Sequence, residues 1–171
     1  MMDMAFGETD KSCLNVLYVM GIYRNRIFIF DGWIGRWGTA ERINIIKKAE
    51  ERYPGVPLYI EDDVSQIATV RDIQKKLKYL KIRNFTSKGK GQNYKVIYEG
   101  EQNAAKKGKI HDSLGVPWTD GRYYIYEKLP GFDELKFQIL QFPKCEAFDQ
   151  IDAVAMGTIV LRDFAQNRLS L

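Results

Sequence analysis

Two short runs of apolar and β-branched residues lie close together near the N-terminus. Leu14 to Tyr23 reads LNVLYVMGIY, and Arg26 to Trp33 reads RIFIFDGW. Runs of this length and composition are typical of β-strands. The intervening pair Arg24-Asn25 is short enough for a tight turn. The pattern therefore predicts a β-hairpin.

Beyond the hairpin, the apolar residues recur with helical spacing. Ile43, Ile46 and Ala49 form a stripe at intervals of three residues, which places them near one face of a helix. The helix is expected to run from Ala40 to about Arg52, with Thr39 as its N-cap because a threonine side chain can accept a bond from the first turn.

The spacing then alternates between strand-like and helical. Leu58 to Ile60 is a short apolar run, and Val64 to Leu80 has a helical pattern. The order strand, strand, helix, strand, helix favours an α/β fold with a mixed sheet flanked by helices over an all-α or all-β plan.

Three further elements are predicted in the C-terminal half. Arg122 to Lys128 (RYYIYEK) is strand-like, and Phe132 to Phe142 has the spacing of an amphipathic helix. A last helix is expected from about Asp149 into the 160s, where an apolar stretch follows two aspartates.

Composition and length restrict the class of protein. A chain of 171 residues that is 45% hydrophobic can bury one core, and its length suits a single domain spanning residues 1–171. No apolar run approaches the roughly 20 residues that a membrane helix needs, so no membrane partner is expected. Cys13 and Cys145 make neither a disulfide framework nor a Cys-x-x-Cys pair, which fits a reducing compartment.

Positive charge is concentrated between Lys75 and Lys109. This segment has eleven basic and two acidic residues, an excess of +9, whereas the whole chain carries +4. Ser87 to Gly91 (SKGKG) within it reads as a mobile basic loop. Exposed lysines often only solvate a surface, but this excess interleaved with aromatic residues suits a polyanion. The residues expected to contact DNA are Lys88, Lys90, Lys106, Lys107 and Lys109.

Carboxylates stand at positions where burial would be costly without a cation. Glu61 follows the predicted strand that ends at Ile60, while Asp149 and Asp152 lie one helical turn apart, which makes them neighbours on one helix face. Asp3 interrupts a short apolar flank and precedes Asp10. Brought together, such a set of oxygen ligands could hold two Mg²⁺ or Mn²⁺ ions and support phosphodiester cleavage.

Each carboxylate also has a simpler interpretation. Asp149 could cap its helix, and either aspartate would complement the positive end of the helix dipole. Glu61, Asp62 and Asp63 could form a solvated loop with Asp63 as an N-cap, and Asp3 could be an ordinary terminal residue. The metal-site hypothesis therefore rests on the conjunction of the positions.

Several other chemistries are excluded by missing motifs. The single histidine, His111, cannot build a histidine-rich zinc site and is expected at a surface or facing DNA. The chain has no GxSxG elbow and no GxxxxGK[ST] phosphate loop, so neither serine-hydrolase nor ATPase chemistry is indicated.

Four short motifs, in this order, resemble the C-terminal nuclease domain of the terminase large subunit of tailed bacteriophages, an RNase H-like domain. The resemblance spans nearly the whole chain. The motifs are Asp3-Met4-Ala5-Phe6-Gly7 with Asp10, the hairpin end Ile29-Phe30-Asp31-Gly32-Trp33, the strand end Tyr59-Ile60-Glu61-Asp62, and Phe142-Pro143 leading into Asp149-Gln150-Ile151-Asp152-Ala153.

The resemblance implies a catalytic, metal-binding set of Asp3, Glu61, Asp149 and Asp152, with Asp10 as a further ligand. In the usual pattern two adjacent acids precede the spaced one, whereas Phe148 takes the first place here. Which of the two final aspartates is the principal ligand is therefore left open.

The implied activity is a metal-dependent endonuclease that cuts concatemeric viral DNA during genome packaging in the host cytoplasm. The implied partners are double-stranded DNA, a terminase ATPase domain, the small terminase subunit and the portal protein. The ATPase motor is absent from the sequence, and Asp3 stands so near its start that most of a first strand is expected to be missing.

Two alternatives remain from the residues. A junction resolvase on the same RNase H-like fold would also use clustered carboxylates, and it would prefer four-way junctions. A non-catalytic module that docks nucleic acid or protein would use the acids only as caps.

Overall fold

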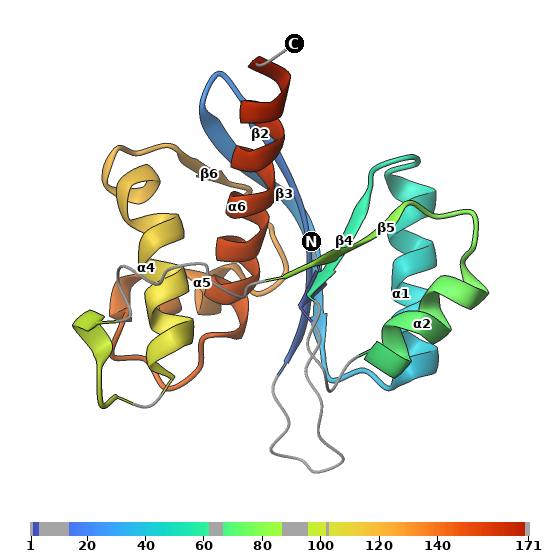
Figure 1. The fold of residues 1–171 in the computed structure, drawn as a ribbon, viewed down its shortest axis with the longest axis horizontal. Helices are drawn as coiled ribbons and strands as arrows, with labels where there is room; N and C mark the ends of the chain where they lie inside the picture. The colour runs from blue at the N-terminus through green and yellow to red at the C-terminus, as the bar shows by residue number, and fades with distance from the viewer. Residues whose placement is uncertain (1, 4–13, 62–66, 87–95, 102, 170–171) are drawn as a thin grey trace.

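The computed structural model describes residues 2–3, 14–61, 67–86, 96–101 and 103–169, with side chains described for 14–61, 71–86, 97–101 and 103–166. Its centre is a six-stranded sheet in the order β5-β4-β1-β2-β3-β6 (Figure 1). β1 pairs antiparallel with β2, and β2 with β3, while the other neighbours are parallel. The strands are β1 (Met2–Asp3), β2 (Asn15–Tyr23), β3 (Arg26–Gly35), β4 (Leu58–Glu61), β5 (Ile82–Phe85) and β6 (Tyr123–Ile125).

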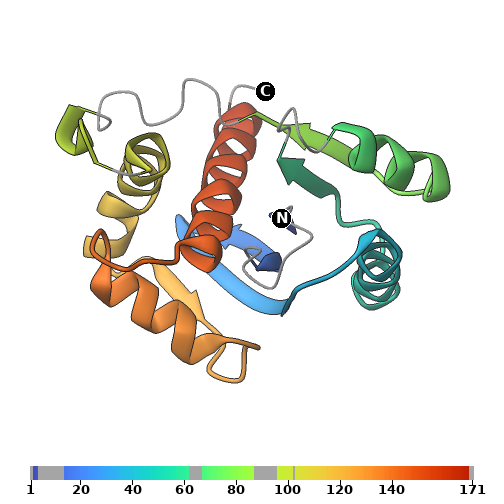
Figure 2. The same cartoon turned by 90° about the horizontal axis from the view of Figure 1, so that it is seen from below.

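Helices cover both faces of the sheet. α1 and α2 lie together on one side, and α4, α5 and α6 lie on the other (Figures 1 and 2). No helix in the described part of the chain is long and apolar enough to cross a membrane. The helices are α1 (Thr39–Arg52), α2 (Ile67–Lys76), α4 (Ala104–Thr119), α5 (Phe132–Gln141) and α6 (Asp149–Leu169), with a 3₁₀ turn η2 (Val96–Tyr98).

Alternation along β2 produces the two layers of core. Val16 and Tyr18 are fully buried in the cluster that includes residues of α4, α5 and α6, whereas Leu17 is buried against α1 and α2. This is the period-two pattern of a strand buried on both faces. α6 is the most deeply buried helix, since every residue from Asp149 to Ile159 is buried.

The predicted α/β class, a mixed sheet flanked by helices, is confirmed, and so is the hairpin. Arg24 and Asn25 both have positive φ, 46° and 62°, as a two-residue turn matched to the strand twist requires. The first helix is confirmed to Arg52, but the N-cap prediction was wrong. Thr39 is already helical, and the N-cap is Gly38, which offers no side-chain bond.

The basic segment contains structure that the sequence did not reveal. β5 lies within this segment, and α4 begins near its end. α4 includes Gly108, Gly115 and Pro117, all poor helix formers, so its pattern does not stand out from that of a loop. The strand predicted at Arg122 to Lys128 is shorter, and the loop predicted at Ser87 to Gly91 lies outside the described residues.

Alanine substitutions at two glycines with positive φ test how tightly the turn before α5 is packed against α6. Gly131, with φ of 72°, leaves a Cβ only 2.5 Å from Ile34 Cδ1 and 3.1 Å from the amide of Gln150, whereas Gly121, with φ of 64°, has open space. We expect Gly121→Ala to cost about 1–2 kcal/mol for the left-handed backbone and Gly131→Ala about 1–2 kcal/mol more for overpacking. Urea unfolding of both variants measures the difference, and equal losses would contradict the described packing.

Candidate functional site

The carboxylate of Glu61 lies at the end of β4 on the side of the sheet covered by α4 and α6. Its neighbour Ile60 is fully buried in the core on the α1 and α2 side, and successive strand residues point to opposite faces. The Glu61 side chain is 15% exposed. β4 is parallel to β1, with Ile60 opposite Met2, so the backbone of Asp3 lies beside the end of β4.

Two more carboxylates stand on the first turn of α6. Asp149 and Asp152 are both buried, with side chains 12% and 4% exposed. Asp149 is itself helical, and its Oδ2 accepts a hydrogen bond from the backbone N–H of Leu14 at 3.0 Å. Its described bond therefore holds the start of β2 rather than the end of its own helix, which departs from the capping interpretation.

Lysines from α4 lie between these carboxylates. Lys109 Nζ is 2.7 Å from Asp152 Oδ1 and 3.3 Å from Glu61 Oε1. Lys106 Nζ is 3.2 Å from Asp152 Oδ2 and 3.6 Å from Asp149 Oδ1. The three acidic side chains and two ammonium groups thus form one ion-pair network, which joins β4, α4 and α6.

Burial makes this network energetically demanding. The Lys109 side chain is 7% exposed, and an ion withdrawn from water costs several kcal/mol unless a partner compensates. Lys109 supplies that partner to two carboxylates at once. Buried acids of this kind need a nearby positive charge, and in this structure the Lys109 side chain provides it.

A buried glutamine fixes the first turn of α6, and no local sequence pattern indicates this contact. Gln138, on α5, accepts hydrogen bonds at Oε1 from the backbone N–H groups of Gln150 and Ile151, both at 3.2 Å. Tyr18 donates from its hydroxyl to Gln150 Oε1 at 2.6 Å, and burial raises the pKa of Tyr18 above its ordinary value. The helix end that bears both aspartates is thereby held by α5 and β2.

The remaining predicted residues fall into two groups. The side chain of Asp3, and Asp10, Lys88 and Lys90 as a whole, lie outside what the structure describes. Lys107 is described, and its Nζ lies 2.6 Å from Glu101 Oε2. That Lys106, Lys107 and Lys109 contact DNA stays a prediction, and the ammonium of Lys109 lies against the carboxylates of Glu61 and Asp152.

The carboxylates of this site are of the ligand type that a divalent cation prefers, but the described side chains are not positioned around one. Carboxylate oxygens are the ligands that Mg²⁺ and Mn²⁺ prefer. Asp152 Oδ1 is buried and, among the described residues, accepts no hydrogen bond of normal geometry despite its ion pair with Lys109. No group of three or more Asp, Glu, His or Cys side chains among those described is arranged to hold a metal ion. Glu61 and Asp152 therefore have the right kind of side chain to bind a metal ion, but the Lys109 ammonium lies between them.

His111 lies away from the open surface expected for it. It is half-buried on α4, its Nδ1 is 2.9 Å from the Tyr98 hydroxyl, and its ring packs edge-on against Phe142. These contacts give it a packing role between α4, η2 and the end of α5.

The strand order, with acids at the end of β4 and at the start of a packed helix, corresponds to the RNase H-like fold expected from the sequence. A solved structure of the human cytomegalovirus terminase nuclease domain, soaked with manganese and bound to an inhibitor, superposes with a TM-score of 0.57. The match covers 95% of this chain and 82% of that one at 21% identity. The chain thus has the fold of a terminase nuclease domain. No protein-family model and no curated protein sequence matches it significantly.

Removal of the central ammonium tests the network. We expect Lys109→Met to destabilise the metal-free protein at neutral pH by about 3 kcal/mol, because it leaves buried carboxylates without their partner. The matched control is Lys76→Met, since Lys76 pairs with Asp72 on the open surface of α2, where a pair contributes about 0–1 kcal/mol. Denaturant unfolding measures both, and similar small losses would show that the buried network does not depend on Lys109.

Proposed function

We propose that this chain is the nuclease domain of a DNA-packaging terminase, a metal-dependent endonuclease that cuts concatemeric viral DNA. One observation carries the proposal. Carboxylates from β4 and α6 converge on a single ammonium, that of Lys109, in a chain with the fold of a terminase nuclease domain. Acids that converge on a cation at the end of a central strand are what a metal-assisted hydrolase requires.

The residues proposed to hold the metal are Asp3, Glu61, Asp149 and Asp152, with Asp10 as a further ligand. Glu61 and Asp152 would supply oxygens from opposite walls of the site, and Asp3 would add a third from the strand between β4 and β2. Two bound Mg²⁺ or Mn²⁺ ions would activate water and stabilise charge on the phosphodiester oxygens. Gln138 and Tyr18, which fix the start of α6, would keep the aspartates in position.

The lysines of α4 are proposed to exchange partners. Without metal, Lys106 and Lys109 neutralise the carboxylates. With metal bound, the same carboxylates would bind the ions, and the ammonium groups would become available to DNA phosphates. Lys106, whose side chain is 30% exposed, is the better placed of the two. Lys107 and the segment with Lys88 and Lys90 would extend the contact along the duplex.

The wider setting follows from the same proposal. A packaging nuclease acts on double-stranded DNA together with an ATPase domain that moves the DNA, a small terminase subunit and a portal protein, in the host cytoplasm. These partners are expectations of the proposed class of enzyme, whereas the carboxylate site is a feature of this chain.

Plasmid nicking in Mn²⁺ tests the activity. We expect Asp152→Asn to lower the nicking rate at least about 100-fold, because the loss of a charged ligand removes several kcal/mol of metal-dependent stabilisation. Glu61→Gln should act likewise. Asp163→Asn is the matched control, since Asp163 is an exposed aspartate on the same helix, and it should nick at the wild-type rate.

The outcomes separate the alternatives. Equal nicking by wild type, Asp152→Asn and Glu61→Gln would contradict the proposed site. Faster cleavage of four-way junctions than of linear duplex would favour a resolvase. DNA binding without any metal-dependent cleavage would favour a docking module whose acids serve only the ion-pair network.

Thermal melting in Mn²⁺ tests metal binding without reference to cleavage. Ligand binding to the folded state adds RT ln(1 + [L]/Kd), about 2.7 kcal/mol at a hundredfold excess over Kd. We expect Mn²⁺ to raise the melting temperature of the wild type and of Asp163→Asn, and to have little effect on Asp152→Asn. NaCl at the same ionic strength controls for screening, and an equal rise in all three proteins would contradict a specific site.

A further inference from the structure

Aromatic side chains are exposed on one face of β2, β3 and β6. Ile29 of β3 is buried in the core formed with α4, α5 and α6, so its neighbour Phe28 points to the opposite face of the sheet. α1 and α2 lie on that opposite face, but toward β4 and β5 and away from β6 (Figures 1 and 2). Beyond them, Tyr23, Phe30 and Tyr124 are 62%, 48% and 43% exposed.

The strand register brings these residues together. Tyr23 of β2 is opposite Arg26 of β3, and Phe28 is opposite Gly21 on one side and Tyr124 of β6 on the other. Residues that stand directly opposite each other in neighbouring strands share a face. We call the surface that they form with Phe30 the aromatic face, which consists of Tyr23, Arg26, Phe28, Phe30 and Tyr124.

A bulge and a glycine give Phe30 its position on this face. The register shifts between Val19 and Met20, which leaves Phe30 as an extra residue of β3 without a partner in β2. A Cβ added to Gly21 would lie only 2.9 Å from Phe30 Cε2. The Phe30 ring therefore extends across the neighbouring strand, over a position that has no side chain.

Three of the rings lie in nearly parallel planes. The ring centroids of Phe28 and Phe30 are 5.9 Å apart with an interplanar angle of 7°, and those of Phe28 and Tyr124 are 5.1 Å apart at 23°. Parallel rings at such separations are offset and overlap only in part, which agrees with the exposure of Phe30 and Tyr124. A row of this kind offers π-faces on which other flat ring systems can stack.

Two arginines add positive charge at the turn end of the aromatic face. Arg24 Cζ lies 5.2 Å from the ring centroid of Tyr23, and Arg26 Cζ lies 5.4 Å from that of Tyr124. Neither guanidinium is paired with a carboxylate among the described residues. Both cations therefore remain available to an anionic ligand.

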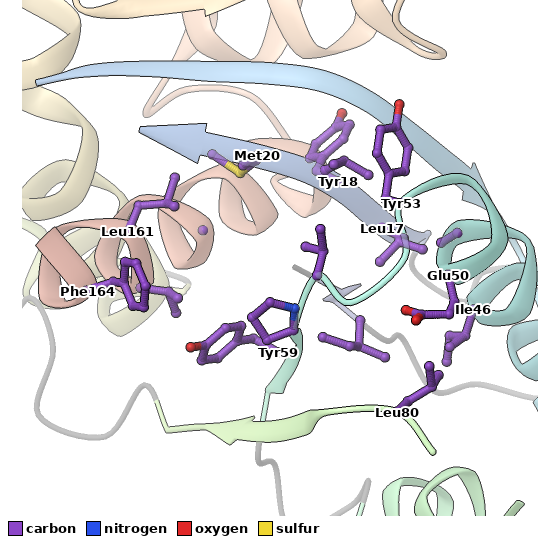
Figure 3. A pocket seen from close by; sticks show the side chains of 17 residues that line it. Leu17, Tyr18, Met20, Ile46, Glu50, Tyr53, Tyr59, Leu80, Leu161 and Phe164 are labelled. Carbon is purple, nitrogen blue, oxygen red and sulfur yellow. The ribbon is translucent and has the colours of Figure 1, made fainter. Parts of the chain in front are cut away.

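The acidic charge of these strands is neutralised from α1. Among the described residues of β2, β3 and β6, the one carboxylate is that of Asp31. Tyr53, just after α1, points toward β3 (Figure 3), and its hydroxyl donates to Asp31 Oδ2 at 3.0 Å. Arg52 Nη1 lies 3.1 Å from the same oxygen. The aromatic face is thus positive overall, as contact with a polyanion requires.

We propose that the aromatic face binds single-stranded nucleic acid, with bases stacked on Phe28, Phe30 and Tyr124. Arg24 and Arg26 would hold its phosphates. Unpaired bases expose their flat faces, whereas the bases of a duplex cover one another, so the surface should select single strands with little sequence preference. This inference goes beyond the nuclease proposal and does not depend on it, because the aromatic face lies on the opposite side of the sheet from the carboxylate site.

Charge and ring geometry favour nucleic acid over a protein partner. Tyrosine, phenylalanine and arginine are also common in protein interfaces, so composition alone does not decide. Among the described residues of the three strands, however, the large exposed apolar side chains are all aromatic, and their planes are close to parallel. The charges without an acidic partner are both cations, which matches a chain of phosphates.

Fluorescence anisotropy with a short labelled oligothymidylate, measured in EDTA so that no metal-dependent cleavage occurs, tests the proposal. We expect Phe30→Leu and Tyr124→Leu each to raise the Kd for the single strand about tenfold, because leucine keeps apolar volume but removes the stacking surface. The affinity for a duplex of the same length should not change. Phe137→Leu is the matched control, since Phe137 is a similarly exposed ring on α5, and it should alter neither affinity.

Two further measurements separate stacking from charge. The same oligonucleotide with abasic sites in place of its bases should bind the wild type and Tyr124→Leu equally. Arg26→Gln should reduce the slope of log K against log salt concentration by about 0.7, the value for one phosphate contact of a single strand.

Three outcomes would overturn the proposal. The first is equal affinity of the wild type for the normal and the abasic strand, and the second is an equal loss of single-strand and duplex affinity in Phe30→Leu and Tyr124→Leu. The third is single-strand binding that neither variant changes. In that case, weaker self-association of both variants in sedimentation would assign the aromatic face to a second copy of the chain.

Discussion

The buried ammonium of Lys109 is the interaction on which the site depends. It lies within 3.3 Å of both Glu61 and Asp152, so it joins the end of a central strand to the first turn of the most buried helix. Without a cation at this point, the like charges would oppose the packing of α6 against the sheet. Fold and site are therefore not separable here, because the charges proposed for chemistry are also contacts between layers.

The same geometry accounts for the anchoring of α6. Its first turn is bonded to α5 through Gln138, to β2 through Tyr18, and to Leu14 through Asp149. A helix end placed in the interior must find partners for its free N–H groups, and a side chain from a neighbouring helix supplies two of them. The aspartates consequently stand on a rigid base, which is the property that a precise ligand set requires.

Local patterns made much of the fold predictable. The hairpin, the first helix and the last helix follow from periodicity and turn residues that act within a few positions, and Glu61 was located as the end of a strand. α4 could not be recovered, because its glycines and proline weaken its local signal and its stability comes from packing against α6 and η2. For the same reason Lys106 and Lys109 read as surface charges. Their partners are about 40 or more residues away in the sequence, and only the fold brings them together.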